Sequence, residues 1–310
     1  MSGDPAAMGS SDGSRQLSAP PTLGAAGIWT RALDAVPGGE AQEAVAELED
    51  LGYGAVWIPE AIQREVVSHA TLLLAGSSSI VVATGIANIH ARAPRSAALA
   101  QDLLTQRFPQ RFMLGLGVSH AFVVERVLHQ SYGSPLQAMS AYLDVIDTTL
   151  AVQQPRVLAA LGPKMLTLAK ERALGAHTYM SPVEHTAWAR EVLGTGPLLV
   201  PAMKAVLDSD VARARELGAS AVAPTLRMPA YRENLRRLGF GDPDVAGTPS
   251  SRVVDALVAH GGVDEIVDAV RAHLAAGADH VCVEVLCEDG EGLPSAAWRE
   301  LAPALTSLGS

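Results

Sequence analysis

The chain has 310 residues, of which 48% are hydrophobic, 4% aromatic and 18% charged, and its formal net charge is −10. This length and apolar fraction suffice for one large domain with a sizeable core. The basic residues never gather into a run and no apolar stretch reaches the ~20 residues of a membrane helix, so we predict neither a nucleic-acid partner nor a membrane partner.

The N-terminal segment and the cysteines bear on the compartment. Residues 1–21 are small, polar or proline and lack the basic and apolar regions of a secretory signal. We interpret them as a disordered tail and residues 22–310 as a single domain. Cys282 and Cys287 are the only cysteines, and their close spacing in one strand-like run argues against a disulfide bond. Free thiols are typical of a reducing compartment, which predicts a cytoplasmic protein.

After the tail, short apolar runs alternate with amphipathic stretches, as in repeated βα units. The intervening stretches, such as EAQEAVAELEDLGYG and VDEIVDAVRAHLAAGA, have helical periodicity, and several end on glycine. We therefore predict eight strands with helices between them. The predicted strands are Leu23–Trp29, Ala55–Pro59, Ile80–Ile86, Arg111–Gly117, Arg156–Leu161, Ala176–Met180, Leu198–Val206 and His280–Leu286.

Eight strands alternating with helices favour an α/β fold of the (β/α)8 TIM-barrel type over an open doubly wound sheet. The glycine fingerprint of a dinucleotide-binding sheet is absent, because Gly115-Leu116-Gly117 lacks the third glycine at the required spacing. The segment from Pro224 to Gly262 breaks the βα rhythm with proline, glycine and the basic stretch YRENLRRLGF. We predict that it is an insertion before the last strand, acting as a lid or as a dimer element.

In a barrel of this type the active site lies where the strands end, so polar residues at these positions are the candidates. They are Trp29, Thr30, Glu60, Asn88, His90, Arg92, Ser119, His120, Gly162, Lys164, His177, Tyr179, Lys204 and Glu284. No pair of histidines or carboxylates has metal-ligand spacing, so we predict no metal site.

Histidine exchanges protons near neutral pH, which makes His69, His90, His120 and His177 candidate acids or polarising donors. We favour His120, because the glycine-containing run before it brings it to a strand end. Glu60 follows a buried strand and can serve as a base with a raised pKa, as a helix cap, or as a partner of Arg64.

Two further features suggest ligand contacts. Gly162-Pro163 joins a strand directly to a helix, and free N–H groups at a helix start favour an anion such as phosphate, although an ordinary turn fits the same residues. Trp29 could cover a planar ring or simply fill the core. Lys204 lies within an apolar strand and needs an anionic partner, either substrate, cofactor or Glu284.

The stretches LEDLGYGAVWIPE, VVATGIANIHARAPRSAALAQDL, RFPQRFMLGLGVSH and PRVLAALGPKMLTLAKERALGAHTYMSPVEHTAWAR resemble the luciferase-like monooxygenase superfamily, and within it the actinobacterial coenzyme F420-dependent oxidoreductases. The resemblance extends from about Leu23 to about Leu286. It implies a barrel, usually dimeric, that holds a deazaflavin or flavin ring in its C-terminal mouth. It also implies a non-proline cis peptide after strand three, which corresponds to Ala87–Asn88 here.

The resemblance also assigns candidate site residues. The cofactor phosphate would lie on the turn formed by Gly162, Pro163 and Lys164, and Gly117, Val118 and Ser119 would border the ring. The full set of candidate cofactor contacts is Trp29, Ala87, Asn88, Gly117, Val118, Ser119, Leu161, Gly162, Pro163, Lys164 and His177. The candidate catalytic residues are His120, His90 and Glu60.

One departure affects the mechanism. Sugar-phosphate dehydrogenases of the superfamily have histidine after strand two and glutamate after strand four, whereas this chain has Glu60 and His120 there. Their catalytic assignment therefore does not transfer. The hypothesis is hydride transfer between F420 and a small organic substrate in a homodimer, with His120 or His90 as proton donor. The alternatives are an FMN-dependent monooxygenase supplied by a separate reductase, and a non-catalytic barrel subunit.

Overall fold

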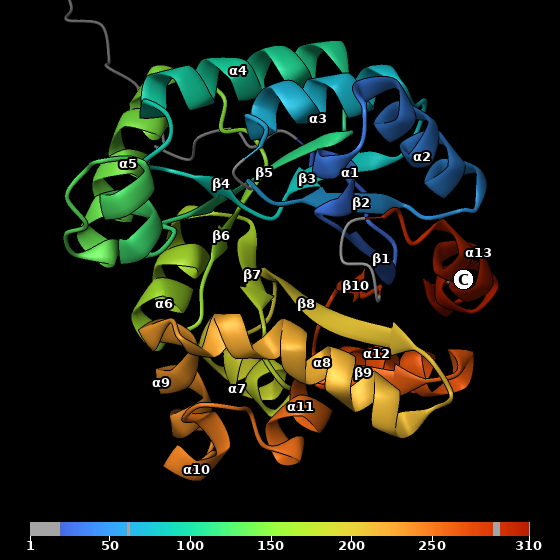
Figure 1. Ribbon diagram of the computed structural model, residues 1–310. Coiled ribbons are helices and arrows are strands. Elements are labelled where there is room, and N and C mark those ends of the chain that lie inside the picture. Colours follow the sequence, from blue (N-terminus) through green and yellow to red (C-terminus); the bar gives the residue numbers. More distant parts are fainter. Residues whose placement is uncertain (1–18, 61–62, 288–291, 310) are drawn as a thin grey trace, which may run out of the picture.

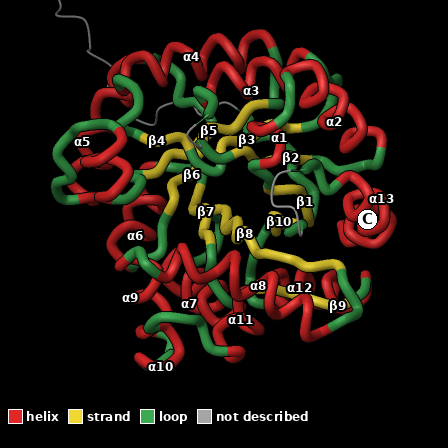
Figure 2. Tube along the Cα trace, viewed as in Figure 1, coloured by secondary structure: helices red, strands yellow, loops and turns green. Residues whose placement is uncertain are grey.

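Eight parallel strands form a closed barrel in the computed structural model, which describes residues 19–60, 63–287 and 292–309. The ring closes through the last strand, which pairs with both the first strand and β8. Figure 2 shows the strands as an inner ring within an outer ring of helices. The predicted TIM barrel is confirmed. The barrel strands are β1 (Ala26–Trp29), β2 (Ala55–Ile58), β3 (Val81–Thr84), β5 (Phe112–Gly117), β6 (Arg156–Ala159), β7 (Gly175–Tyr179), β8 (Leu198–Leu207) and β10 (Val281–Val285).

A helix follows each of these strands and packs its apolar face on the barrel (Figure 1). Proline occupies the start of three of them, where its missing N–H has no intrahelical role, and the carboxylate of Glu65 caps another. The helices are α1 (Ala32–Ala35), α2 (Gly38–Asp50), α3 (Val66–Ala75), α4 (Pro94–Arg107), α5 (Pro135–Thr149), α6 (Pro163–Arg172), α7 (Val183–Leu193), α12 (Val263–Ala275) and α13 (Ser295–Thr306). Two shorter helical segments are η1 (Val123–Val127) and η2 (Ser307–Gly309).

Two short strands were not predicted. The run predicted as one strand, Ile80–Ile86, stops at Thr84, and after a bend β4 (Ala87–Asn88) pairs with β5. The non-proline cis peptide joins Gly85 and Ile86, so its predicted position at Ala87–Asn88 was wrong by two residues. The bond lies in the bend between β3 and β4, whereas Ala87 and Asn88 are themselves paired strand residues.

The other unpredicted strand is β9 (Val258–Gly261), which pairs with β8 after the part of β8 that pairs with β7. Strand β8 is ten residues long; its first half pairs with β7, and its residues from Lys204 to Leu207 pair with β9. On its other edge β8 pairs with β10. The outer part of β8 therefore leaves the barrel wall and carries a separate strand.

Between β8 and α12 the chain forms the predicted insertion. The helix α8 (Val211–Leu226) precedes it and contains its predicted start at Pro224, and the insertion itself holds α9 (Pro229–Arg237), α10 (Asp242–Val245), α11 (Ser251–Leu257) and β9. These elements form a small apolar cluster around Leu235 and Phe240, which also includes Met180 and Val206 of the barrel. Figure 1 shows α9, α10 and α11 along the lower edge of the molecule, beside α7. The insertion flanks the barrel mouth.

The barrel interior is filled by side chains. Trp57 and His177 stack face to face with ring centroids 4.9 Å apart, and Trp57 Nε1 donates to Nε2 of His280 over 3.1 Å. Smaller side chains, including Val157 and Val200, fill the remaining space. A packed interior places any ligand site of the barrel at one of its two ends.

Candidate active site

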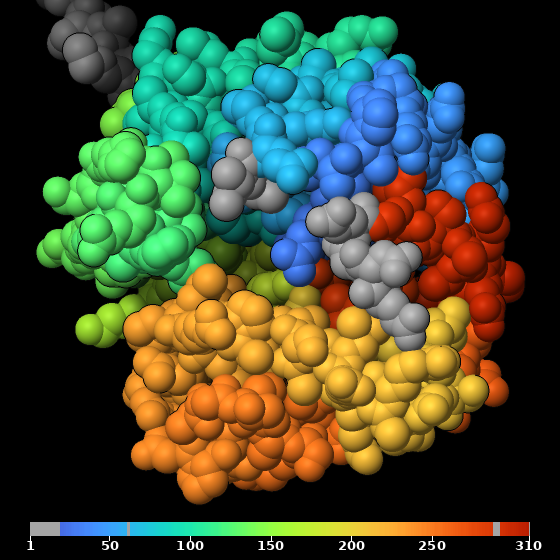
Figure 3. Space-filling view, in the orientation of Figure 1, coloured from blue at the N-terminus to red at the C-terminus, as the bar shows by residue number. Residues whose placement is uncertain are grey.

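The strand ends meet at the face turned toward the viewer in Figures 1 to 3. Figure 3 shows a hollow at the centre of this face, between the blue and teal segments and the orange insertion. The side chains that border it come from the ends of β1, β2, β5, β7, β8 and β10, from the β3–β4 bend, and from α9. We call this hollow the mouth.

A buried hydrogen-bonded cluster forms the floor of the mouth. Glu284 Oε2 accepts from Nζ of Lys204 over 2.5 Å and from the hydroxyl of Tyr179 over 2.8 Å. Lys204 Nζ also donates to the Tyr179 oxygen over 2.8 Å. Burial, reinforced by Glu284, raises the pKa of Tyr179 well above its usual range, so its hydroxyl stays protonated. Glu284 is thus the anionic partner of Lys204, one of the alternatives considered from the sequence.

Trp29 completes this floor. Its ring stacks on Tyr179 with centroids 5.0 Å apart, and its Nε1 donates to the carbonyl of Gly85 over 2.8 Å. A Cβ on Gly85 would lie 2.8 Å from that Nε1 and 3.2 Å from Nε2 of His177, so only glycine fits there. The tryptophan is therefore fixed between Tyr179 and the bend that contains the cis peptide, and it is 6% exposed.

Glu60 is held by Arg92 and by a backbone amide. Arg92 donates to both oxygens of Glu60 and also pairs with Glu65, while the N–H of Asn88 donates to Glu60 Oε2 over 2.6 Å. The predicted alternative partner, Arg64, instead donates to backbone carbonyls of Leu33 and Val36. A carboxylate engaged in this way is better suited to fixing the β4 backbone than to accepting a proton from substrate.

His90 and His120 lie on neighbouring loops of the mouth. The His90 ring is 6.1 Å from Tyr132, whose hydroxyl donates to the carbonyl of Ser119, the residue before His120. The His120 ring is 5.5 Å from Tyr231 of α9. Burial lowers the pKa of both histidines, so both rings are uncharged at neutral pH. Nε2 of His90 is buried and has no hydrogen-bond partner in the described residues.

The candidate ring-bordering residues lie close together. Gly117 ends β5 beside Asn88 of β4, and a Cβ on Gly117 would lie 2.5 Å from Cδ1 of Ile86. Ala87 is fully buried, whereas Val118 and Ser119 are partly exposed. These residues form a tight wall along one side of the mouth.

The Gly162 turn is open to solvent. Gly162 is the N-cap of α6, Pro163 follows as the first helical residue, and no side chain caps the turn. The nearest atom to a Cβ placed on Gly162 is Nη2 of Arg237 at 3.9 Å. Lys164 is exposed, and the carbonyl of Leu161 is 3.0 Å from Nε2 of His185. The first-turn N–H groups therefore remain available to an anion.

The positions of two residues, His177 and Arg237, were not predicted from the sequence. His177 was assigned to cofactor contact, but it is 2% exposed within the barrel, below the mouth. Burial lowers its pKa to about 4, its Nδ1 lies 2.9 Å from the carbonyl of Val200, and its Nε2 has no partner in the part of the chain described. Arg237 was not singled out, although it belongs to the basic stretch noted in the insertion.

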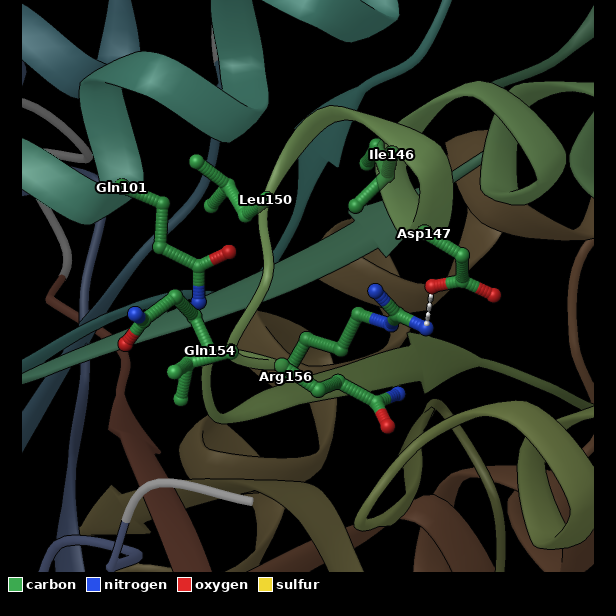
Figure 4. A pocket seen from close by; sticks show the side chains of 8 residues that line it. Gln101, Ile146, Asp147, Leu150, Gln154 and Arg156 are labelled. Atoms are coloured by element: carbon green, nitrogen blue, oxygen red, sulfur yellow. Dashed lines mark hydrogen bonds and ion pairs between the residues drawn. The ribbon is translucent and has the colours of Figure 1, made fainter. Parts of the chain in front are cut away.

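Two hollows at the opposite end of the barrel carry no comparable chemistry. One, of about 10 Å³, lies near the start of β6 (Figure 4), and its Arg156 is already paired with Asp147 over 2.5 Å. The other, of about 370 Å³, lies where β1, β8 and β10 begin. There His280 is engaged with Gly24 and Trp57, and Asp279 is paired with Arg190. Because their polar groups already have protein partners, we place the site at the mouth.

The described residues lack two other features that bear on function. They contain no group of three or more histidine, cysteine or carboxylate side chains able to hold a metal ion. Within the same residues, no helix has the length and apolar character needed to cross a membrane.

The family model for luciferase-like monooxygenases matches residues 21–280, which is most of the chain. This chain belongs to the luciferase-like monooxygenase family. The resemblance inferred from the sequence motifs is therefore confirmed.

The similarity to a relative with a named activity is more distant. A Mycobacterium tuberculosis protein named "Putative coenzyme F420-dependent oxidoreductase Rv3520c" is 28% identical over 144 residues, which is 46% of this chain and 41% of that protein. The match therefore spans well under two thirds of that relative.

Solved structures of luciferase-like folds superpose over nearly the whole chain. An F420-dependent tetrahydromethanopterin reductase from Methanopyrus kandleri gives a TM-score of 0.75 at 18% identity, covering 93% of this chain and 100% of that one. An F420-dependent secondary alcohol dehydrogenase gives 0.71 at 13%, covering 92% and 99%. The FMN-bound oxygenating constituent of a Pseudomonas putida diketocamphane monooxygenase gives 0.69 at 12%, covering 93% and 98%. At these identities the superpositions establish a shared fold.

Proposed function

We propose that this protein is an oxidoreductase that transfers hydride between coenzyme F420 and a small organic substrate at the mouth. The observation that carries the proposal is the Gly162 turn. It offers uncapped N–H groups of α6, an open glycine position and the guanidinium of Arg237 at the strand-end face of a luciferase-like barrel. These features fit the phosphate of a flavin-type cofactor. The choice of F420 is supported by the similarity to the M. tuberculosis protein, which is named as a putative F420-dependent oxidoreductase.

F420 supplies the carbon centre that accepts or releases hydride when it is bound. The side chains of this protein would orient the substrate and move the accompanying proton. His120 is the favoured proton carrier, with His90 as the second candidate. Because burial lowers the pKa of His120, its neutral ring is ready to accept a proton from an alcohol at neutral pH. Donation in the reductive direction requires the protonated ring and would increase as the pH falls.

Glu60 takes a positioning role in this proposal. Arg92 and the Asn88 amide occupy its oxygens, and Asn88 in turn accepts from the N–H of His90 over 3.0 Å. The carboxylate thereby fixes the segment that carries His90. We also propose that the protein is a cytoplasmic homodimer. Light scattering of the purified protein would measure its mass and so check the dimer.

An FMN-dependent monooxygenase is the second candidate. The same phosphate turn would serve FMN, and a luciferase-like neighbour of nearly equal structural similarity contains FMN. The aromatic rings of Trp29, Tyr179 and Tyr231, which pack against one another at the mouth, suit chemistry that requires exclusion of water. The cofactor that binds separates the two candidates, and a non-catalytic subunit would bind neither.

The decisive experiment is a fluorescence titration of the purified protein with F420 and, separately, with FMN. It is repeated with Gly162→Asp, because an aspartate at this N-cap position stabilises the helix while placing a negative charge where the phosphate would lie. Gly133→Asp, at an open surface position, is the matched control. F420 binding that is lost only in Gly162→Asp supports the proposal. Preferential FMN binding would shift it to the monooxygenase, and binding of neither would refute both.

A further inference from the structure

Helix α9 of the insertion contacts the candidate cofactor site at two places, the mouth and the Gly162 turn. Near its start, the ring of Tyr231 is 6.3 Å from Tyr179 and 5.5 Å from His120. At its last residue, Nη1 of Arg237 donates to the carbonyl of Leu161 over 3.3 Å. One helix outside the βα repeat therefore connects the mouth with the Gly162 turn.

Arg237 is held in place without an acidic partner. Its guanidinium lies over the ring of Trp188 at 5.1 Å, and its Nη1 donates to Oδ1 of Asn234 over 2.9 Å. No carboxylate lies within ion-pair distance of it in the described chain, whereas the adjacent Arg236 pairs with Asp242 over 2.6 Å. Its Nη2 is the atom closest to the open side of Gly162. Arg237 thus presents an uncompensated positive charge to the turn.

A buried donor lies beside it. Asn234 is 1% exposed, and its Nδ2 has no hydrogen-bond partner in the ranges described. The oxygen of the same carboxamide is bound to Arg237, which in turn contacts Leu161, so the amide group lies next to the turn. Buried donors are nearly always paired in native proteins, and an unpaired one at a candidate ligand site indicates a missing acceptor.

We propose that Arg237 and Asn234 of α9 bind the phosphate group of the cofactor together with the first-turn amides of α6. A guanidinium matches the geometry of phosphate oxygens and can donate two parallel hydrogen bonds to them. The insertion is then part of the cofactor site. This inference rests on the proposed function, because it requires a phosphate-bearing flavin or deazaflavin.

The test compares ligands that differ only in the phosphate-bearing part. Dissociation constants are measured by fluorescence for FMN against riboflavin, and for F420 against its phosphate-free parent, the deazaflavin that carries an unsubstituted ribityl chain. The variants are Arg237→Gln, which removes the charge, and Arg237→Lys, which keeps the charge but cannot donate two parallel hydrogen bonds. Arg236→Gln is the matched control, since Arg236 is the neighbouring arginine and already pairs with Asp242.

In Arg237→Gln we expect the dissociation constant of the phosphate-bearing ligand to rise by about tenfold to a hundredfold, the range for loss of a charge-assisted hydrogen bond. The phosphate-free ligand should change less than about twofold, because it makes no such bond. Arg237→Lys should fall between Arg237→Gln and the wild type, and Arg236→Gln should match the wild type. Unchanged binding of the phosphate-free ligand also demonstrates that the variant is folded.

Two results would overturn the inference. If Arg237→Gln weakens both members of a ligand pair equally, or neither, while the wild-type protein binds the cofactor, then Arg237 does not read the phosphate and the proposed function stands. If the wild-type protein binds neither F420 nor FMN, the proposed function fails and this inference fails with it.

Discussion

The ammonium group of Lys204 lies 2.5 Å from Oε2 of Glu284, and the two side chains are only 1% and 4% exposed. The residues are direct neighbours in the pairing of β8 with β10. This pair therefore sits at the joint where the last strand closes the barrel, and it also fixes the hydroxyl of Tyr179 at the floor of the mouth.

Replacing Lys204 by methionine should strongly destabilise the protein. The substitution leaves the Glu284 carboxylate buried without a cation, and breaking a buried pair in this way costs about 3–5 kcal/mol. Chemical denaturation would measure the loss. The double variant Lys204→Met/Glu284→Leu should recover most of it, because neither charge then remains. Equal stability of the single variant and the wild type would show that water reaches Glu284.

Arg92→Leu should destabilise the β4 region of the mouth. Arg92 pairs with Glu60, and the two side chains are 9% and 10% exposed, so the glutamate would lose its main counter-charge in a largely buried position. We expect a loss of about 3 kcal/mol in the free energy of unfolding. The exposed Arg95, in the first turn of the following helix α4, provides the control: Arg95→Leu should change stability by less than about 0.5 kcal/mol. Similar effects of the two substitutions would contradict this account.

Three buried histidines should make the protein sensitive to mild acid. Burial lowers the pKa of His177, His273 and His280 to about 4. The unfolded chain binds protons near pH 6.5, so these groups contribute their full stabilisation above that pH and lose it as the pH falls from 6.5 toward 4. Each contributes a slope of about 1.4 kcal/mol per pH unit within that window.

Denaturation curves between pH 8 and 5.5 would check this dependence before most carboxylates titrate. His273→Gln should reduce the slope of the unfolding free energy against pH by the contribution of one histidine, about 1.4 kcal/mol per pH unit. A free energy of unfolding that stays constant over this range would mean that the three rings are protonated in the folded protein.

Gly115→Ala should prevent normal folding. A Cβ at this position would lie 2.0 Å from the carbonyl oxygen of Thr84, whose hydroxyl exchanges two hydrogen bonds of 2.8 Å with the Gly115 backbone. Neither backbone segment can move without breaking the β3–β5 pairing, so we expect a loss of at least about 4 kcal/mol or no soluble protein. Gly133→Ala, with no neighbouring atom within 4 Å, should be close to neutral. Circular dichroism and the thermal midpoint would compare the two.

The regular part of the fold could be predicted from the sequence. Buried parallel strands are continuous apolar runs, and the helices between them carry a periodic apolar face, so all eight barrel strands were located to within a few residues. The two extra strands carry no such signal. Ala87–Asn88 is too short for any periodicity, and Val258–Gly261 contains a histidine and a glycine.

The candidate site was predictable in part. The strand ends from which these candidates come do lie on one face, because all the barrel strands are parallel. Partners across the mouth could not be predicted: Glu60 pairs with Arg92, 32 positions away, and not with nearby Arg64. Likewise, the position of Arg237 beside Gly162 depends on how the insertion folds back. His177 lies within the predicted strand, but the sequence alone does not show whether its side chain points into the barrel, because that depends on the register of β7 with its neighbours.

The pairing of β9 with β8 has a consequence for motion. The hydrogen bonds between β8 and β9 resist sliding of one strand along the other, so they anchor the insertion to the barrel at its C-terminal end. Any displacement of β9 relative to the barrel has to bend β8, and the pairing of β9 with β8 begins at Lys204 itself. Tension on the insertion would thus be transmitted to the joint between β8 and β10. A ligand that displaces the insertion would therefore also displace β10, because both are joined to β8.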